Sequence, residues 1–453
     1  MSEQSLERVR QAHAALKSGD LEGAMKFANE ALDLDFNNPL AMFQLGYGFM
    51  QAERYGLAYQ MFMRCSQLQP DRAEAWNNAG MCRQSVWDLD DAERCFRKAL
   101  QLEPDNQASL SNLALVYINR CKPEEALKWI SRAEKAGKDH WQSLDNKALA
   151  LIMLRRWREG WAAYRETAGF HKQRQLRTYK TPEEPMWNGE PGTVVVYGNQ
   201  GLGDEISFAS CIPDAMQKAE VIVDCDHRLA GLFRRSFPDA KVYGTRHAPS
   251  RDWDHAIDFS IPNDCLPSLF RNETDDFPGT PYLKADPERR IQWRALFDTF
   301  RKPVIGIAWT GGLKNTGQAK RSLTLESLLP VLRAVDATWI SLEYKDRSEE
   351  IADLERLHGI RIHDYPRATR TQDYDDTAGM VAELDLVVSV TTAVVHLAGA
   401  LGKECWCLTP NKPRFFYGLE GDLPWYKSVK MFRQKQEWPL AEMANLLKLR
   451  WGK

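Results

Sequence analysis

A run of glycines and carboxylates in the middle of the chain holds the first residues that could do chemistry. The stretch VVVYGNQGLGDEISFAS, residues 194–210, passes from a buried-strand pattern through three glycines to an acid pair and a helical pattern. Strand, glycine turn and helix commonly aim a helix N-terminus at a phosphate. The stretch matches neither common phosphate-binding glycine motif, and carboxylates there would repel a phosphate. Asp204 and Glu205 therefore either cap the helix, which its dipole favours, or act on something other than phosphate.

A second loop combines glycines with cations. The segment WTGGLKNTGQAKRS, from Trp309 to Ser322, follows an apolar run and carries Lys314, Lys320 and Arg321. Arginine can bind phosphate oxygens through two parallel hydrogen bonds. The segment is therefore either a diphosphate-binding loop or a solvated basic surface loop.

A third loop ends a strand pattern in hydroxyl groups. In SVTTAVVHLAGALG, Thr391 and Thr392 precede a helical pattern that begins near Ala393. Hydroxyls and free N–H groups at a helix N-terminus form an anion site, although simple capping accounts for the same residues. His396 lies one turn into this helix, where it either contacts a ligand or is buried and hydrogen-bonded.

Two acidic strings are weaker candidates. The D-x-D string from Asp224 to Asp226 has a spacing that binds metal in some sugar transferases. A three-residue match arises easily by chance, so we predict no metal site. Asp376 and Thr377 open a helical pattern, where capping is the default interpretation.

The elements that must position these loops follow an α/β pattern. After residue 192, short apolar runs alternate with helical patterns, which predicts βαβ units and parallel sheets. TVVVYG, AEVIVDC and HAIDFS are the expected strands of a first half, 193–299; VIGIAW, ATWISL, LDLVVSV and ECWCL belong to a second half, 300–453. Two Rossmann-like halves in sequence predict a cleft where the strand carboxyl ends meet. The last helical pattern, 440–449, could fold back across that cleft.

The first third of the chain repeats with a period of about 34 residues. Matching pairs at this spacing are Pro70 and Pro104, Ala58 and Ala92, Phe62 and Phe96, and Gly46 and Gly80. These identities are the tetratricopeptide signature, with small residues where helices approach, phenylalanines between neighbouring repeats and a proline after the second helix. We therefore predict a repeat solenoid over 1–174, ending in a degenerate helix pair near 141–170, and a linker at 175–192.

The surface of such an array offers two uses. Its concave groove either holds a peptide or partner protein or serves as a packing platform. Four asparagines fall in first helices, where they could bind a peptide backbone or be solvated: Asn77, Asn78, Asn112 and Asn146.

Composition narrows the class of protein. The 453 residues suffice for about three domains, and 43% hydrophobic residues is ordinary for a globular protein. A net charge of -2 argues against nucleic-acid binding. Nine cysteines without a C-x-x-C pair or zinc spacing predict reduced thiols. The polar start MSEQSLERVR and apolar runs shorter than about 18 residues predict a cytoplasmic protein without a leader or membrane span.

Together the motifs resemble a known combination. NQGLGDEISFASCIPD resembles the EQGLGDxxQFARYxP segment of bacterial proteins in which tetratricopeptide repeats precede a glycosyltransferase domain. GIAWTGG, Arg321-Ser322, DTAGMVAELDLVVSV, TTAVVHLAGALGK and LPWYKSVKMFRQ match the same pattern in the same order, over nearly the whole chain. The catalytic part is similar to glycosyltransferase family 9, the ADP-heptose heptosyltransferases. The arrangement is also similar to that of the O-GlcNAc protein transferases.

The resemblance implies a GT-B fold and an inverting, metal-independent transfer from a nucleotide-sugar, without a cofactor. The aspartate thought to serve as base in the heptosyltransferases matches Asp204. The acceptor-side loop would comprise Asn199, Gln200, Gly201 and Gly203. The expected donor-binding residues are Trp309, Lys314, Lys320, Arg321, Asp376, Thr377, Thr391, Thr392, Ala393 and His396.

The sequence departs from the family pattern in both loops. Thr391 stands where the donor-phosphate pattern D-T-(G/A)-x-x-H-L-A has aspartate, and Asn199 stands where the first loop has glutamate. The donor base therefore stays open among ADP, UDP and GDP. Two hypotheses follow: a transferase whose protein or glycan acceptor is held partly by the repeats, and a scaffold whose repeats bind a protein while its GT-B part is a pseudoenzyme.

Overall fold

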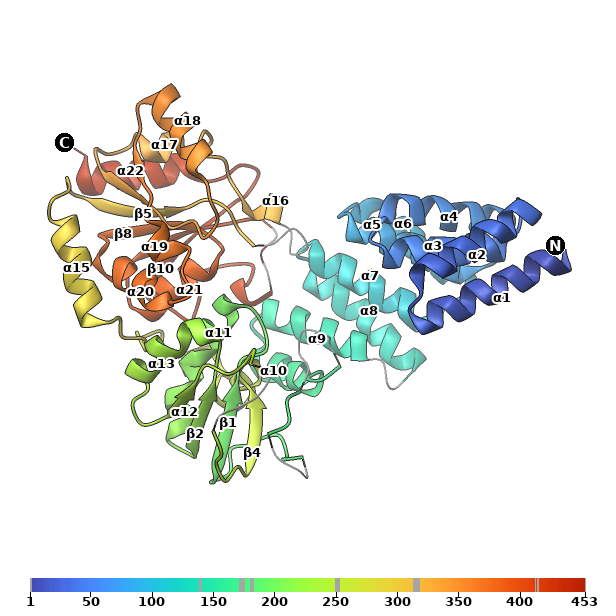
Figure 1. Cartoon of the computed structure of the whole chain (residues 1–453), viewed down its shortest axis with the longest axis horizontal. Coiled ribbons are helices and arrows are strands. Elements are labelled where there is room, and N and C mark those ends of the chain that lie inside the picture. Colours follow the sequence, from blue (N-terminus) through green and yellow to red (C-terminus); the bar gives the residue numbers. More distant parts are fainter. Residues whose placement is uncertain are drawn as a thin grey trace. The chain divides into compact units, whose positions relative to one another are not determined.

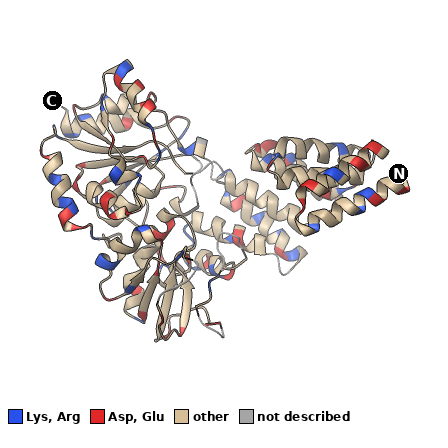
Figure 2. Ribbon diagram, viewed as in Figure 1, with Lys and Arg blue, Asp and Glu red and all other residues tan. Residues whose placement is uncertain are grey.

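The chain divides into two compact units (Figure 1). The computed structural model describes residues 2–137, 141–170, 176–179, 183–248, 253–312, 318–411, 413 and 415–452. The first unit is Met1–Leu154 and the second is Arg155–Lys453. Acidic and basic residues are interspersed on the helices of both units (Figure 2), in keeping with the near-zero net charge. Within the described ranges no helix is long and apolar enough to cross a bilayer.

The first unit is a stack of helix pairs. Its helices are α1 (Glu3–Ser18), α2 (Leu21–Leu34), α3 (Pro39–Gln51), α4 (Tyr55–Leu68), α5 (Ala73–Ser85), α6 (Leu89–Leu102), α7 (Gln107–Asn119), α8 (Pro123–Ala136) and α9 (Trp141–Met153). Each helix contacts the next along the stack. The predicted helical solenoid is therefore confirmed as far as Leu154.

A left-handed residue closes the turn inside each pair. The residues at these turns of the first unit recur every 34 positions, with φ between +55° and +81°: Gly19, Glu53, Trp87 and Cys121. For a residue with a side chain, this left-handed conformation costs about 1–2 kcal/mol of conformational energy, so glycine is favoured there. Only the first turn has glycine, so Glu53, Trp87 and Cys121 adopt the left-handed conformation despite this cost.

Glycines let the paired helices approach closely, as the sequence predicts. A Cβ at Gly46 would lie 3.0 Å from the Phe62 ring, and one at Gly80 would lie 2.6 Å from the Phe96 ring. Both phenylalanines thus pack on the glycine of their own repeat. The prediction that they lie between neighbouring repeats is incomplete, although Phe62 also joins a cluster with Ala79 of the next repeat.

The asparagines of the first helices form a ladder through the array. The Asn112 Nδ2 donates to the Asn77 Oδ1 at 3.0 Å, and the Gln142 Nε2 donates to the Asn112 Oδ1 at 3.1 Å. The Asn146 Nδ2 donates to the Ser111 carbonyl at 2.8 Å. Asn77, Asn112 and Asn146 are all at least nine-tenths buried. These three side chains therefore join α5, α7 and α9, and they are neither solvated nor open to a peptide.

The second unit begins with a parallel four-stranded sheet in the order β3-β2-β1-β4. Its strands are β1 (Thr193–Tyr197), β2 (Glu220–Asp224), β3 (Lys241–Tyr243) and β4 (Phe259–Pro262). β1 pairs with β2 on one side and with β4 on the other. The strand order therefore reverses between β1 and β4, and their following loops diverge there.

A second sheet is parallel and six-stranded, in the order β10-β9-β8-β5-β6-β7. Its strands are β5 (Val304–Ala308), β6 (Thr338–Ser341), β7 (Ile362–His363), β8 (Leu386–Val390), β9 (Cys405–Thr409) and β10 (Val429–Arg433). Here the order reverses between β5 and β8, as in doubly wound dinucleotide-binding sheets. The strands absent from the sequence prediction (β3, β7 and β10) lie at sheet edges, where short, half-exposed segments have a weak apolar signal.

Helices cover both sheets. They are α10 (Trp157–Glu166), α11 (Leu202–Phe208), α12 (Ile212–Met216), α13 (Ala230–Ser236), α14 (Pro267–Phe270), α15 (Pro287–Phe297), α16 (Gln318–Arg321), α17 (Leu329–Leu332), α18 (Ser348–His358), α19 (Pro366–Thr369), α20 (Tyr374–Glu383), α21 (Ala393–Ala400) and α22 (Leu440–Trp451). The C-terminal α22 buries Met443 and Leu447 in the core of the second sheet and contacts α17 (Figure 1). It belongs to the second half and makes its main contacts there.

The boundary of the second unit differs from the predicted one at residue 174. α10 lies in the degenerate helix pair predicted to end the repeats, but its Trp157 and Trp161 rings lie about 6.1 Å from the Trp425 ring. In the predicted linker, Trp187 is fully buried, its ring lies 6.0 Å from the Phe270 ring, and its backbone N–H donates to the Ser260 carbonyl at 3.0 Å. Aromatic packing therefore assigns these segments to the α/β unit. Residues 171–175 and 180–182 lie outside the described residues.

Candidate functional site

The glycine loop lies at the carboxyl end of β1, at the point where the first sheet reverses. In doubly wound sheets, ligands bind at such reversal points. The loop leads into α11, and the Asp204 carboxylate accepts the Gly201 N–H at 3.2 Å. Asp204 is half-buried, so its carboxylate both caps its helix and remains within reach of solvent.

The neighbouring acid has a different environment. Glu205 is 1% exposed, forms an ion pair with Arg246 and accepts the Asp226 N–H at 3.0 Å. Burial raises its pKa to about 7, against the opposing attraction of the Arg246 guanidinium. A Cβ at Gly198 would lie 2.3 Å from the Glu205 carboxyl carbon. Gly198 is thus needed to make room for this carboxylate, and Glu205 is more than the first-turn dipole residue that the sequence suggests.

Arg246 also holds the glycine loop itself. Its guanidinium donates to the Gln200 carbonyl as well as to Glu205. The arginine follows β3 and lies 41 residues from its carboxylate partner. No local motif marks it, and sequence reasoning missed it.

The acceptor-side amides hydrogen-bond to a buried carboxylate in the turn that follows β4. The Gln200 Nε2 donates to the Asp264 Oδ2 at 2.6 Å and to the Tyr164 hydroxyl at 2.7 Å. The Asn199 Nδ2 donates to the Asp264 Oδ1 at 3.3 Å. Asp264 is fully buried just after β4, on the other side of the reversal point. Sequence reasoning missed Asp264 and Tyr164, although the βαβ pattern could have directed attention to the end of each strand.

Hydroxyl groups occupy the reversal point of the second sheet. Thr391 and Thr392 follow β8, and the Thr392 Oγ1 accepts the Val394 N–H at 3.3 Å as the cap of α21. Thr391 is 3% exposed, and its Oγ1 has no hydrogen-bond partner within the described part of the chain. A buried hydroxyl without a partner is uncommon and needs an explanation such as a ligand or a water.

α11 and α21 touch at their N-terminal turns. A Cβ at Gly203 would lie 3.1 Å from the Ala393 Cα and 3.3 Å from the His396 ring. The first turn of α11 contains both Gly203 and Asp204. The structure therefore brings the predicted base helix against the predicted phosphate helix, as expected if the two halves share one site.

The basic loop is only partly described. Lys314 lies outside the described residues, whereas Lys320 is exposed and Arg321 is 8% exposed. Gly311 passes close to the Arg321 backbone, because a Cβ there would lie 2.9 Å from the Arg321 carbonyl oxygen. The two described ends of the loop, at Gly311 and Arg321, thus lie against each other.

Trp309 faces the core of the second half. Its side chain is fully buried, and its indole N–H donates to the Glu350 carboxylate at 3.1 Å. Its backbone N–H and that of Thr310 donate to the Glu343 Oε1 at 2.7 and 2.8 Å. Burial raises the pKa of Glu343. Trp309 therefore anchors the start of the loop, and its ring, which was expected to bind the donor, lies in the core.

Asp376 and Thr377 also have structural partners. The Asp376 carboxylate pairs with Arg289 at 3.1 Å, and the Thr377 hydroxyl donates to the Ala368 carbonyl. The cap of α20 is Asp373, not Asp376. Both predicted donor contacts are thus engaged by α15 and α19.

His396 is buried between aromatic residues. Its Nε2 lies 3.0 Å from the Tyr417 hydroxyl and its Nδ1 lies 3.2 Å from the Tyr426 hydroxyl. Both ring nitrogens therefore have partners within the protein. Of the two roles considered from sequence, this is the buried, hydrogen-bonded histidine and not the ligand contact.

The aspartates of the D-x-D string are separately engaged. Asp224 is fully buried and accepts the Tyr179 hydroxyl at 2.8 Å and the Arg177 guanidinium at 2.9 Å. Burial would raise the pKa of Asp226, but hydrogen bonds from Arg228 outweigh it and lower the value to about 2. No cluster of three or more His, Cys, Asp or Glu side chains that could hold a metal occurs among the residues described.

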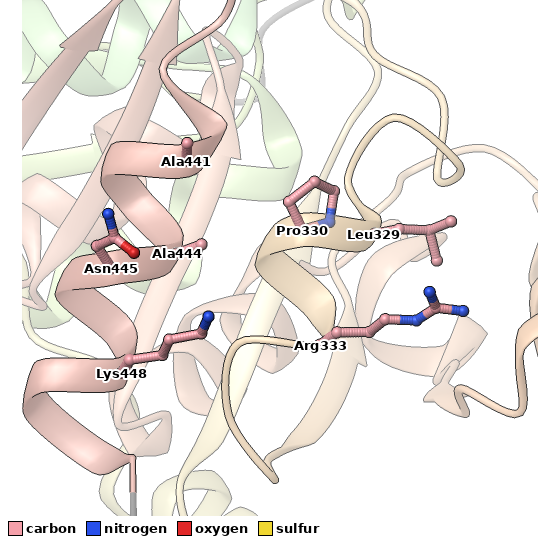
Figure 3. A pocket seen from close by; sticks show the side chains of 7 residues that line it. All are labelled: Leu329, Pro330, Arg333, Ala441, Ala444, Asn445 and Lys448. Carbon is pink, nitrogen blue, oxygen red and sulfur yellow. The ribbon is translucent and has the colours of Figure 1, made fainter.

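A pocket of about 400 Å³ lies elsewhere, between α17 and α22 (Figure 3). Lys448 points from α22 towards α17, whereas Arg333 points away from α22 (Figure 3) and contacts the His358 ring at 3.3 Å. The remaining lining residues are Leu329, Pro330, Ala441, Ala444 and Asn445. These residues lie on helices and not at strand carboxyl ends, so the pocket is separate from the loops described above.

Comparison with known families identifies the first unit. Two tetratricopeptide-repeat models match the chain, at residues 8–38 and 88–148. With the helix pairs and the 34-residue recurrence of the turns, these matches define the class: a tetratricopeptide-repeat array is joined to an α/β unit of two parallel, doubly wound sheets.

One curated relative is Protein FlbA of Caulobacter vibrioides. The chain is 30% identical to it over 310 residues, which are 64% of this chain and 51% of FlbA. The chain therefore spans about half the length of this relative.

Solved structures resemble the chain over part of its length. PilF of Pseudomonas aeruginosa is 20% identical and matches 38% of this chain and 78% of its own, with a TM-score of 0.35. A thermophilic tetratricopeptide-repeat protein of Thermus thermophilus is 14% identical and matches 36% of this chain and 89% of its own, with a TM-score of 0.33.

Proposed function

We propose that the chain is an inverting, metal-independent glycosyltransferase with a GT-B catalytic unit. The second half would bind a nucleotide-sugar, and the first half would present the acceptor. The contact of Gly203 with Ala393 carries the proposal, because it sets a carboxylate-bearing helix turn against a helix N-terminus that suits a diphosphate. The unpartnered, buried Thr391 hydroxyl supports a ligand at the same helix end.

The proposed reaction is a direct displacement at the anomeric carbon. The acceptor hydroxyl oxygen forms a bond to that carbon while the bond to the diphosphate oxygen breaks, which inverts the configuration. Asp204 takes the acceptor proton, and general bases of this kind contribute roughly 10²–10⁴-fold. The N–H groups of α21, Thr391 and Arg321 stabilise the departing diphosphate, together with Lys314 or Lys320.

The repeats would hold the acceptor, either a protein or a glycan. Within the array, α3 and α7 contain no charged residue, so their surfaces suit a neutral segment better than a charged one. Tetratricopeptide arrays present a concave face along such first helices. A cytoplasmic location remains a prediction.

Nucleotide binding by the full chain tests the donor site. ADP, UDP and GDP would each be titrated calorimetrically against the wild type, Thr391→Val and Thr377→Val. Thr391→Val removes a hydroxyl that has no partner, so we expect unchanged stability and about five- to tenfold weaker binding, the value of one lost hydrogen bond. Thr377→Val is the matched control, because its hydroxyl donates to Ala368, and should bind as the wild type does.

A non-catalytic scaffold is the second candidate. It is favoured by the engagement of Asp204 as a helix cap and by Thr391 in place of the aspartate in the family pattern. If none of the three nucleotides binds at millimolar concentration, the scaffold replaces the transferase. If one binds and Asp204→Asn leaves donor turnover unchanged in a folded protein, Asp204 is not the base.

A further inference from the structure

A hydrogen-bonded chain of buried side chains, three tyrosines and one histidine, connects α21 to α11. Tyr417 contacts the His396 Nε2, and the His396 Nδ1 contacts the Tyr426 hydroxyl. The Tyr426 hydroxyl lies 3.2 Å from the Tyr282 hydroxyl, which donates to the Ile206 carbonyl of α11 at 2.7 Å. The hydrogen-bonded chain thus starts at Tyr417, passes through His396 on the helix expected to bind phosphate, and ends on the helix that carries Asp204.

Counting protons gives this chain a direction. A carbonyl oxygen only accepts hydrogen bonds, so the Tyr282 hydroxyl donates its single proton to the Ile206 carbonyl. Its oxygen must then accept the hydrogen bond from the Tyr426 hydroxyl. Tyr426 has then spent its own proton and must accept from the His396 Nδ1–H. Burial raises the pKa of both tyrosines, so each retains the proton that it donates.

The remaining ring nitrogen follows from the same count. A neutral imidazole with its proton on Nδ1 can only accept at Nε2, and the Tyr417 hydroxyl supplies that donor at 3.0 Å. His396 is 4% exposed, and a charged ring there would lose its hydration. The neutral Nδ1–H tautomer therefore fits the four hydrogen bonds described above.

Neighbouring contacts make the same connection between the helices. The Tyr282 N–H donates to the Ala400 carbonyl at the end of α21 at 2.9 Å, while its hydroxyl binds α11. The Trp425 indole N–H donates to the Ser207 carbonyl at 3.1 Å. A Cβ at Gly399 would lie 2.3 Å from the Tyr426 ring, so a glycine is required where that ring crosses α21.

We infer that His396 is a positioning residue that holds α11 against α21 through Tyr426 and Tyr282, and that it is not a ligand of the donor phosphate. The hydrogen-bonded chain stands on geometry alone, whereas its role in positioning Asp204 rests on the proposed transfer reaction. In that reaction, the distance between the base and the bound diphosphate would depend on two tyrosine hydroxyls that touch neither substrate.

The first test reads the tautomer in the unmodified protein. Nitrogen-15 NMR of the histidine-labelled full chain would report both ring nitrogens, and the signals missing from His396→Gln identify His396. We expect a protonated Nδ1 and an unprotonated Nε2 at neutral pH. A proton on Nε2, either alone or in an imidazolium, would overturn the assigned direction of the chain.

The second test removes the last hydroxyl of the hydrogen-bonded chain, the one that contacts α11. In Tyr282→Phe, we expect the amides of α11 to exchange with solvent about five- to tenfold faster, in line with one lost buried hydrogen bond. Tyr179→Phe is the matched control, because it also removes a buried hydroxyl, the one bonded to Asp224, and should leave α11 unchanged. Equal exchange of α11 in both variants and the wild type would refute the connection.

The role in the reaction is separated by binding and turnover. If His396 positions α11, Tyr282→Phe should lower kcat while the affinity for the nucleotide that binds the wild type stays within about twofold. His396→Gln should keep that affinity too, and a tenfold loss would make His396 a phosphate ligand. Absence of nucleotide binding in the wild type would refute the proposed function. The NMR and exchange results would still decide whether the hydrogen-bonded chain between α21 and α11 exists.

Discussion

The buried acid behind the glycine loop leads to a specific pH dependence. Glu205 is 1% exposed, and burial raises its pKa to about 7 although Arg246 contacts it. The folded state therefore binds the proton of Glu205 more tightly than the unfolded state does. It follows that the stability due to protonated Glu205 is complete below the ordinary value of 4.5 and declines as the pH rises to about 7.

The size of the effect comes from the two pKa values. Each pKa unit corresponds to about 1.4 kcal/mol, so a change from 4.5 to about 7 corresponds to roughly 3 kcal/mol. In Glu205→Gln this dependence disappears. We therefore expect the stability of the wild type, measured relative to the variant, to fall by up to roughly 3 kcal/mol between pH 4.5 and pH 7.5.

Hydrogen exchange of the full chain measures this difference. The most slowly exchanging amides of β1 and β2 report the opening of the second unit, and comparison at equal pH cancels the intrinsic exchange rates. Glu288→Gln is the control, because Glu288 is exposed in the first turn of α15 and should give a constant difference. A wild-type-to-Glu205→Gln difference that is constant with pH would mean that attraction by Arg246 cancels the cost of burial, and the reasoning would be wrong.

Two further changes test the local geometry of each unit. Glu53→Gly should stabilise the first unit by about 1 kcal/mol or less, because Glu53 is exposed and has φ of +58°. Thermal unfolding would compare this variant with Glu53→Ala, which keeps the strain. If Glu53→Gly is no more stable than Glu53→Ala, the turn is unstrained. Gly203→Ala should destabilise the second unit by about 1–3 kcal/mol, because its Cβ would meet the Ala393 backbone at 3.1 Å; calorimetric unfolding that matches the wild type would show that α11 and α21 are not in close contact.

Much of the fold could be predicted from local patterns. The 34-residue spacing of Gly46 and Gly80 identified the repeats, and the alternation of apolar runs with helical patterns identified the parallel sheets. The glycine loop and the Thr391 loop were predicted at strand carboxyl ends, where β1 and β8 place them. Such signals are readable because each depends on residues close together in the chain.

Other predictions failed where packing overrides a local pattern. α10 has the spacing of a repeat helix, yet Trp157 and Trp161 pack against Trp425 and draw it into the α/β unit. Asn77 and Asn112 have the character of surface residues, but they bond to each other across repeats. A polar residue's position on a helix does not reveal whether its partner is water or the next helix.

By itself, the sequence determined the kinds of elements, their order, and the loops at which strands end, because periodicity and turn residues act over a few positions. The tertiary structure alone decided which side chains meet in those loops: Glu205 with Arg246, Gln200 with Asp264, and His396 with Tyr426. These partners lie 41, 64 and 30 residues apart along the chain. Their meeting depends on strand order and on the approach of α11 to α21, which arise from the packing of the whole unit.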